Sequence, residues 1–191
     1  MWSDECQVKC VTQRRAFVRR PHKISRYHPK FTIKTVKYPG SVMIWGAFSG
    51  AAGKGGLKIL ENGVTMNAKR YIGVLKAELL PYFHLHGSQK FMHDGAPCHR
   101  AKVVTRFLGN KGIPTIKWPG NSPDLNPIEN VWAYMKDKIA DKRNMSVTSI
   151  TKAIKEFWAK DMDMTYLLKL ADSMPRRIRK VIRANGHGIN Y

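Results

Sequence analysis

Apolar and polar residues alternate at the start of the chain, which predicts a β-strand over residues 1–11. One face of this strand carries Trp2, Asp4, Cys6, Val8 and Cys10, and the other carries Ser3, Glu5, Gln7 and Lys9. Asp4 therefore interrupts an apolar face, whereas Glu5 on the polar face is expected to be a solvated charge. Residues 42–48 are apolar on both faces, as a central strand should be, and a glycine-rich turn leads to a strand at 57–60.

Helical spacing of apolar residues dominates most of the remaining chain. Helices are predicted at 67–83, with Ile72, Leu75, Leu79 and Leu80 inward, and at 101–108, with short strands at 90–94 and 114–117. A longer helix follows Pro127, and its apolar stripe consists of Ile128, Val131, Trp132, Met135 and Ile139. A second helix with a Ser146 cap and a third at 166–171 come next. The pattern as a whole predicts one α/β domain.

The last predicted helix, up to Gly186, is strongly basic. Its basic residues are Arg176, Arg177, Arg179, Lys180 and Arg183, and they surround Ile178, Val181 and Ile182. Two interpretations stay open here: a solvated basic face over a packed apolar stripe, or direct contact with DNA.

The net charge of the chain indicates what kind of partner it binds. The chain has 191 residues, 34 Lys plus Arg against 13 Asp plus Glu, and a formal net charge of +21. Residues 6–60 contain no acidic residue, and the basic stretch at 11–40 is expected to be an extended hairpin. Such a field favours a polyanionic partner, with phosphate contacts dominating the affinity. No apolar run is long enough to span a membrane, no signal peptide is visible, and three cysteines do not form a disulfide framework, so we expect an intracellular protein without membrane contact.

Three carboxylates are candidates for catalysis, and each also has a purely structural interpretation. Asp4 on an apolar face needs a cation or a metal, or else forms a salt bridge at a sheet edge. Asp94 ends a predicted strand, where α/β proteins bind ligands, but it also suits the start of a turn before Gly95. Glu129 lies at the edge of its helix's apolar stripe, yet it could be half of a capping box with Asn126.

Four sequence motifs, two of which contain Asp94 and Glu129, point to one protein family. They are SVMIWGAFS at 41–49, HDGAPCHRAK at 93–102, SPDLNPIENVW at 122–132 and SMPRRIRKVI at 173–182, followed by a glycine and a tyrosine. In this order they resemble the catalytic domain of the mariner-type (Tc1/mariner) DNA transposases, over nearly the whole chain. The resemblance implies an α/β fold of the ribonuclease H-like type, a central mixed sheet flanked by helices. It also implies that Asp4, Asp94 and Glu129 are the family's two aspartates and one glutamate.

The resemblance further implies a reaction and its partners. Such a domain binds two Mg²⁺ or Mn²⁺ ions, cleaves double-stranded DNA and transfers strands, and it works as a homodimer on DNA in the nucleus. The basic stretch at 11–40 corresponds to a clamp-loop insertion, and we expect its cations to contact DNA: Arg14, Arg15, Arg19, Arg20, Lys23 and Arg26.

One departure and two other function classes accompany this interpretation. The family's amino-terminal helix-turn-helix modules have no counterpart here, so a truncated or decayed copy without end-specific recognition is expected. A non-catalytic DNA-binding remnant would keep the charge without the chemistry. A zinc-stabilised module would use His93, Cys98 and His99 with Cys6 and Cys10, although no C-x-x-C pair is present. Metal-dependent nicking separates the enzyme from the remnant, and bound zinc would favour the module.

Overall fold

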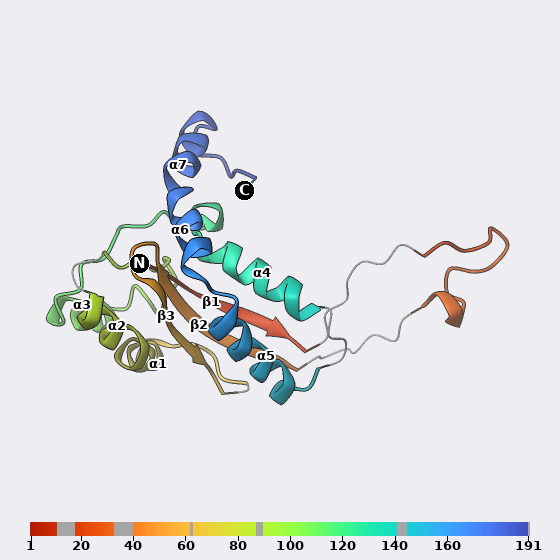
Figure 1. Cartoon of the computed structure of the whole chain (residues 1–191), viewed down its shortest axis with the longest axis horizontal. Helices are drawn as coiled ribbons and strands as arrows, with labels where there is room; N and C mark the ends of the chain where they lie inside the picture. The colour runs from red at the N-terminus through yellow and green to blue at the C-terminus, as the bar shows by residue number, and fades with distance from the viewer. Residues whose placement is uncertain (11–17, 33–39, 62, 87–89, 141–144, 191) are drawn as a thin grey trace.

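Three antiparallel strands form the centre of the computed structural model, in the order β1–β2–β3 (Figure 1). They span Trp2–Lys9 (β1), Ser41–Ser49 (β2) and Gly53–Ile59 (β3). The structure describes residues 1–10, 18–32, 40–61, 63–86, 90–140 and 145–190. Of the five predicted strands, those at 1–11, 42–48 and 57–60 are confirmed over the described residues. β3 begins inside the stretch expected to be a turn, because Ser49 pairs directly with Gly53.

Two further segments extend the pairing beyond β1. Isolated parallel bridges join Trp2 to Met92 and Phe91 to Thr115, and the Ser3 amide donates to the Met92 carbonyl at 3.1 Å. The strands predicted at 90–94 and 114–117 are therefore reduced to single bridges, and the sheet proper is antiparallel. This pairing places β1 between β2 and the Phe91–Met92 segment. It thereby brings the chain just after Met92 next to the start of β1.

One face of the sheet is covered by α4 (Ile128–Ala140), α5 (Val147–Lys160) and α6 (Met164–Asp172) (Figure 1). The predicted stripe of α4 is fully confirmed, since all five of its residues are buried in the core beneath these helices. The Ser146 side chain caps α5 by accepting from the Ser149 amide at 3.1 Å. These helices lie against the sheet because their apolar faces meet Val42, Ile44 and Phe48 of β2.

The opposite face packs against α1 (Ala68–Val74), α2 (Leu80–His86) and α3 (Lys102–Asn110). α1 and α2 are joined without a break by a π-helical turn, Leu75–Leu79, so the single helix predicted from 67 to 83 is present. Asn67 caps it by accepting from the Arg70 amide at 2.9 Å. Trp45 and Ala47 of β2 point to this side, which confirms that β2 is apolar on both faces. Within the described ranges, no helix is long and apolar enough to cross a membrane.

Helix α7 (Met174–Arg183) contradicts one interpretation of its pattern. A packed apolar stripe was expected, but Ile178 is 47% exposed and Ile182 is 68% exposed, whereas Arg177 is only 1% exposed. The packed-stripe interpretation is therefore wrong. The helix turns its arginine inward because buried acceptors are available there, as described below.

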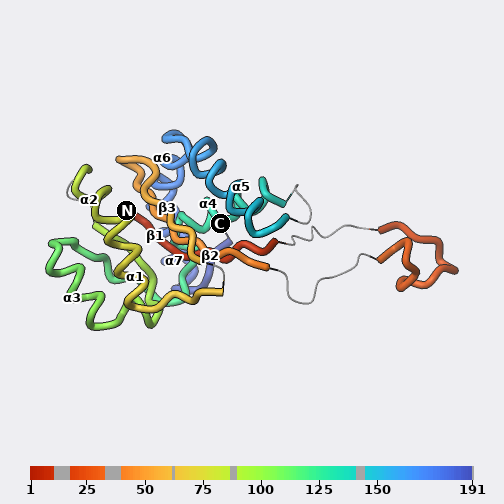
Figure 2. Tube along the Cα trace, turned by 90° about the horizontal axis from the view of Figure 1, so that it is seen from below, coloured from red at the N-terminus to blue at the C-terminus, as the bar shows by residue number. Residues whose placement is uncertain are grey.

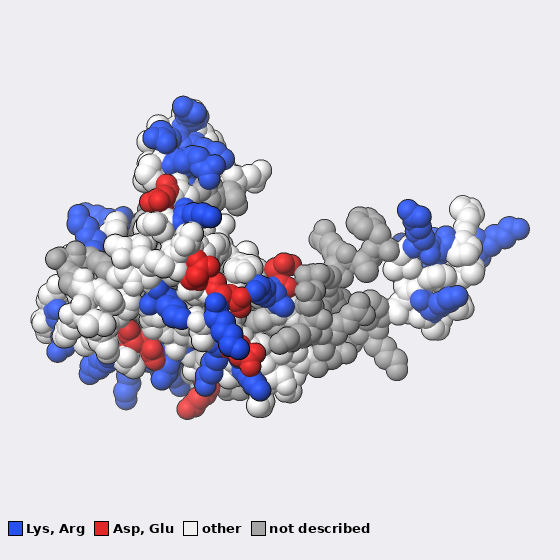
Figure 3. All heavy atoms as spheres, in the orientation of Figure 1, with Lys and Arg blue, Asp and Glu red and all other residues white. Residues whose placement is uncertain are grey.

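The described part of the β1–β2 connection, residues 18–32, projects away from the rest of the molecule (Figures 1 and 2). Nearly all of it is exposed, and its one regular element is a 3₁₀ turn, Pro29–Phe31. Lysines and arginines gather on this projection and over α7 (Figure 3). The rest of the predicted hairpin, including Arg14 and Arg15, lies outside the described residues.

Candidate active site

The three predicted carboxylates line one pocket, although they come from three different elements. Asp4 belongs to β1, Asp94 follows the Met92 bridge, and Glu129 lies in the first turn of α4. The other walls come from the loop between Thr115 and α4, including Trp118 and Asn126. The sheet pairing accounts for this meeting, because β1 lies directly beside the segment that leads to Asp94.

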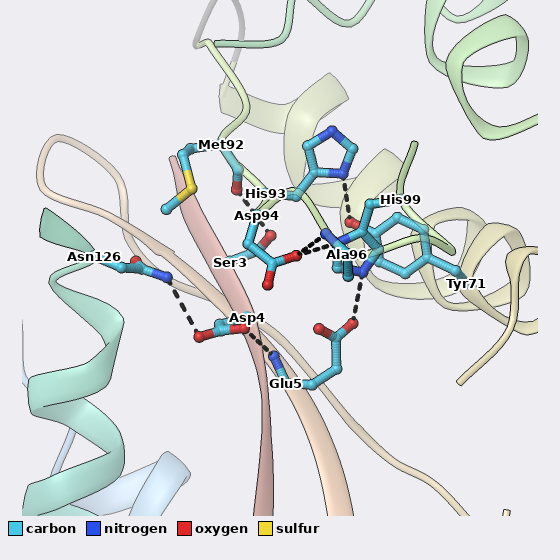
Figure 4. Close-up of polar contacts among 10 residues, drawn as sticks. All are labelled: Ser3, Asp4, Glu5, Tyr71, Met92, His93, Asp94, Ala96, His99 and Asn126. Carbon is cyan, nitrogen blue, oxygen red and sulfur yellow. Dashed lines mark hydrogen bonds and ion pairs between the residues drawn. The ribbon is translucent and has the colours of Figure 1, made fainter. Parts of the chain in front are cut away.

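Asp4 is held from two sides. Its Oδ1 accepts from the Glu5 amide at 2.8 Å, and its Oδ2 accepts from Asn126 Nδ2 at 3.4 Å (Figure 4). Burial raises the pKa of Asp4 to about 8, and the nearby charges of Glu129, Glu5 and Asp94 add to the rise. Of the described Lys and Arg side chains, none forms a salt bridge with Asp4, so the salt-bridge interpretation does not describe this structure.

One carboxylate oxygen of Asp94 accepts two hydrogen bonds from within the protein. Its Oδ1 accepts from the Ala96 amide at 2.9 Å and from His99 Nδ1 at 2.6 Å. The hydrogen bond from His99 lowers the pKa of Asp94, so this carboxylate is charged at neutral pH. The turn interpretation is confirmed by the Ala96 contact. It does not exclude chemistry, because Asp94 is 46% exposed and lines the pocket.

His99 joins Asp94 to a fourth carboxylate. Its Nε2 lies 3.2 Å from Glu5 Oε1, and the imidazole is 2% exposed (Figure 4). Burial alone would lower the pKa of His99, but hydrogen bonds to Asp94 and Glu5 outweigh it and raise the pKa to about 10. The ring is therefore an imidazolium that donates from both nitrogens. The expectation that Glu5 is a solvated charge is wrong, because Glu5 is 17% exposed and pairs with this cation.

A neutral histidine lies beside the charged one. Burial lowers the pKa of His93 to about 4, and the Tyr71 hydroxyl lies 3.0 Å from its Nδ1. The neutral ring accepts this hydrogen bond through Nδ1. The Tyr71 ring also lies 4.1 Å from the His99 ring, between centroids. Tyr71 of α1 therefore contacts both histidines.

Glu129 is not half of a capping box. The Asn126 amide, which a capping-box glutamate would accept from, instead donates to the Pro123 carbonyl at 3.0 Å. Asn126 caps α4 weakly with its own side chain, as predicted, by accepting from the Ile128 amide at 3.4 Å. The Glu129 carboxylate is thus left to the pocket that it lines.

Comparison with known proteins identifies the family. A family model described as DDE superfamily endonuclease matches residues 2–150. The chain belongs to this family. The Tcb1 transposase of Caenorhabditis briggsae is 33% identical and the Tc1 transposase of Caenorhabditis elegans 32% identical, each over 195 residues that cover 100% of the chain and 70% of the relative. This DDE domain is accordingly a catalytic domain of the Tc1/mariner transposase type.

Solved structures agree on the fold. The Mos1 mariner paired end complex with Mn matches with a TM-score of 0.84 at 23% identity, covering 98% of this chain and 56% of that one. The Mos1 catalytic domain alone matches with a TM-score of 0.66 at 23% identity, covering 83% of this chain and 80% of that one. The DDE domain thus has the Mos1 catalytic fold, of the ribonuclease H-like type, and spans a little over half of the longer Mos1 chain.

The donor set of the DDE domain suits a hard divalent cation. Asp4, Asp94 and Glu129 offer carboxylate oxygens, which Mg²⁺ and Mn²⁺ prefer. Burial, and after it the charges of the neighbouring carboxylates, raise the pKa of Asp4, and a bound cation would favour its charged form. Across the described ranges, no three His, Cys, Asp or Glu side chains lie close enough together to hold an ion. Zinc fits less well, since both ring nitrogens of His99 are engaged.

Sequence reasoning missed four residues around this site. Asn126 was interpreted only as a helix cap, Glu5 as a solvated charge, and His99 only as a possible zinc ligand. Trp118 drew no attention, although its neighbours Pro119 and Gly120 are typical of a surface turn, where a large indole needs a reason. Asn126 and Glu5 were misinterpreted because their partners, Asp4 and His99, lie 122 and 94 residues away in the sequence.

The predicted DNA-binding cations do not lie beside the carboxylate pocket. Arg19, Arg20, Lys23 and Arg26 lie on the exposed projection at 18–32, away from the pocket (Figure 1). Arg26 stacks over the ring of Tyr27 at 4.8 Å, and Tyr27 is 71% exposed. The projection thus presents charge and one aromatic ring to solvent.

Proposed function

We propose that this chain is the catalytic domain of a cut-and-paste DNA transposase, which hydrolyses phosphodiester bonds and transfers DNA strands with the help of Mg²⁺ or Mn²⁺. The observation that carries the proposal is the convergence of Asp4, Asp94 and Glu129 on one pocket. Membership of the DDE family and the similarity to the Tc1 and Tcb1 transposases support it. The Mos1 structures with Mg and with Mn support the choice of cations.

In this proposal the three carboxylates would hold two metal ions. Such ions would supply Lewis-acid chemistry that favours the attacking and leaving oxygens of an in-line displacement. Asn126 orients Asp4 by donating to Oδ2, and His99 orients Asp94 by occupying Oδ1, which leaves Asp94 Oδ2 for the pocket. Water as the nucleophile gives strand cleavage, and a DNA 3′-hydroxyl gives strand transfer.

The partners follow from charge. A net charge of +21 and the exposed cations at 18–32 favour double-stranded DNA, with the projection acting as a clamp across the duplex. The paired-end complexes of Mos1 support a homodimer on DNA. Because the similar transposases come from nematodes, we place the site of action in the nucleus.

Nicking of supercoiled plasmid in Mn²⁺ tests the proposal. Wild-type protein should nick, whereas Asp94→Asn and Glu129→Gln should fall to background. Glu156→Gln is the matched control, because Glu156 is an exposed carboxylate on α5. Equal nicking by Asp94→Asn and wild type would point to a contaminating nuclease. Binding of DNA without any nicking would leave the non-catalytic remnant as the better description.

A further inference from the structure

Among the described residues, Arg177 is the most deeply buried charged side chain outside the pocket. It belongs to α7 and is 1% exposed. A buried guanidinium is costly unless its donors are satisfied. Arg177 donates from Nε to Ser173 Oγ at 3.0 Å, from Nη1 to the Asp124 carbonyl at 2.9 Å and from Nη2 to Asn130 Oδ1 at 2.6 Å.

Two of these acceptors lie on either side of Glu129. Asp124 belongs to the 3₁₀ turn Pro123–Leu125, and this turn belongs to the loop that forms the pocket wall. Asn130 directly follows Glu129 in the first turn of α4. One rigid, planar guanidinium therefore fixes the wall of the pocket and the start of α4 relative to each other.

Neighbouring elements reinforce the same two points. The Ile189 amide donates to Asp124 Oδ2 at 2.9 Å, and the Tyr166 hydroxyl of α6 donates to the Asn130 carbonyl at 3.3 Å. The described residues from α6 to Ile189 thus hydrogen-bond to Asp124 and Asn130, on either side of Glu129 in the sequence. None of these residues lines the pocket itself.

The orientation of α7 agrees with this role. A helix that packed only for stability would bury Ile178 and Ile182, yet both are largely exposed and Arg177 is turned inward instead. The three acceptors, rather than apolar burial, decide how α7 is turned.

We propose that Arg177 is a positioning residue for the third carboxylate, holding Glu129 where it can join Asp4 and Asp94 around a divalent cation. This inference rests on the proposed function, because it assumes that the pocket binds metal. Arg177 acts through Asn130 and the Asp124 carbonyl, and it touches neither the cation nor DNA. The competing role is that of an anchor that merely holds α7 to the domain.

Mn²⁺ affinity of the DNA-free chain separates the two roles. Isothermal titration calorimetry should be run on wild type, Arg177→Met, Arg177→Lys and Arg179→Met, well below every melting temperature. Loss of a residue that orients a metal ligand typically costs 10–100-fold in metal affinity, so Arg177→Met should bind Mn²⁺ about 10–100-fold more weakly. Arg177→Lys should recover part of the loss. Arg179→Met removes an exposed arginine of the same helix and should bind like wild type.

A second variant covers the case in which Arg177→Met does not fold. Asn130→Ala removes one acceptor and leaves Arg177 anchored to Ser173 and Asp124, and it should still weaken Mn²⁺ binding several-fold. An anchor alone would lower the melting temperature but leave the affinity of the folded protein unchanged, and that result for both variants overturns the inference. If wild type itself binds no Mn²⁺, the proposed function fails, and the inference fails with it.

Discussion

A single methyl group added at Gly46 should disturb the core directly beneath the candidate site. Gly46 lies in β2 opposite Asp4. A Cβ at this position would lie 2.6 Å from Trp132 Cη2 and 2.8 Å from Trp158 Cη2. Both indoles are almost fully buried, and their rings stack with centroids 5.8 Å apart. Neither ring has room to move aside, so the strand and the helices must separate.

The magnitude of this effect can be bounded. Overpacking of a filled core costs about 1–3 kcal/mol of unfolding free energy. Up to about 1 kcal/mol is recovered, because alanine loses less backbone entropy than glycine on folding. Taking the middle of the overpacking range, about 2 kcal/mol, and subtracting this recovery, we expect Gly46→Ala to be destabilised by about 1–2 kcal/mol. A domain of this size loses roughly 2–4 °C in Tm per kcal/mol, which gives a decrease of about 2–8 °C.

Thermal and urea unfolding, followed by circular dichroism, measure the loss. Gly73→Ala is the matched control, because Gly73 is exposed in α1 and a Cβ there meets nothing within 4 Å. This control should be stabilised by about 0.5–1 kcal/mol. Trp132 lies three residues after Glu129 on α4, so Gly46→Ala should also reduce nicking. If Gly46→Ala unfolds at or above the wild-type temperature, the two close approaches do not constrain the core and the reasoning is refuted.

Three further predictions concern metal, DNA and the pocket wall. Millimolar Mn²⁺ should raise the Tm of wild type but not of Asp4→Asn, and equal shifts would place the ion elsewhere. Arg19→Ala with Arg20→Ala should reduce the slope of log affinity against log salt by about one for each phosphate that these arginines neutralise in wild type; an unchanged slope would remove the projection from the interface. Trp118→Ala should lower nicking about 5–150-fold and Trp118→Phe much less, as expected if the indole stacks on a base at about 1–3 kcal/mol, whereas equal activities would exclude stacking.

Local patterns predicted the elements that bury apolar residues. The stripe from Ile128 to Ile139 identified α4 because residues at helical spacing share a face, and the structure buries all five of them. Alternation identified β1, and the unbroken apolar run identified β2. Ser146 marked the start of α5, since a capping side chain acts on amides only a few residues away. In each case the interaction that stabilises the element lies within the element itself or in its immediate flank.

Polar residues were harder to interpret, because their environment is set by partners distant in the sequence. Glu5 looked solvated, and only the fold shows that His99 lies beside it, 94 residues along the chain. Arg177 looked like part of a solvated basic face, but two of its three acceptors lie 47 and 53 residues away. One of the two interpretations of α7 buried its apolar residues for the same reason, since hydrophobic periodicity carries no information about buried hydrogen bonds.

The three carboxylates depend on the fold in different ways, and this bears on how the site can be damaged. Asp4 is placed by the sheet itself, because β1 lies between β2 and the Met92 segment. Asp94 owes its orientation to one buried cation, His99, which must also satisfy Glu5. Glu129 is placed by α4, and Arg177 of α7 donates a hydrogen bond to Asn130 in the first turn of that helix. Changes in the sheet near Asp4 should therefore act through stability, whereas changes at His99 or Arg177 should in addition alter the orientation of Asp94 or Glu129 in the protein that folds.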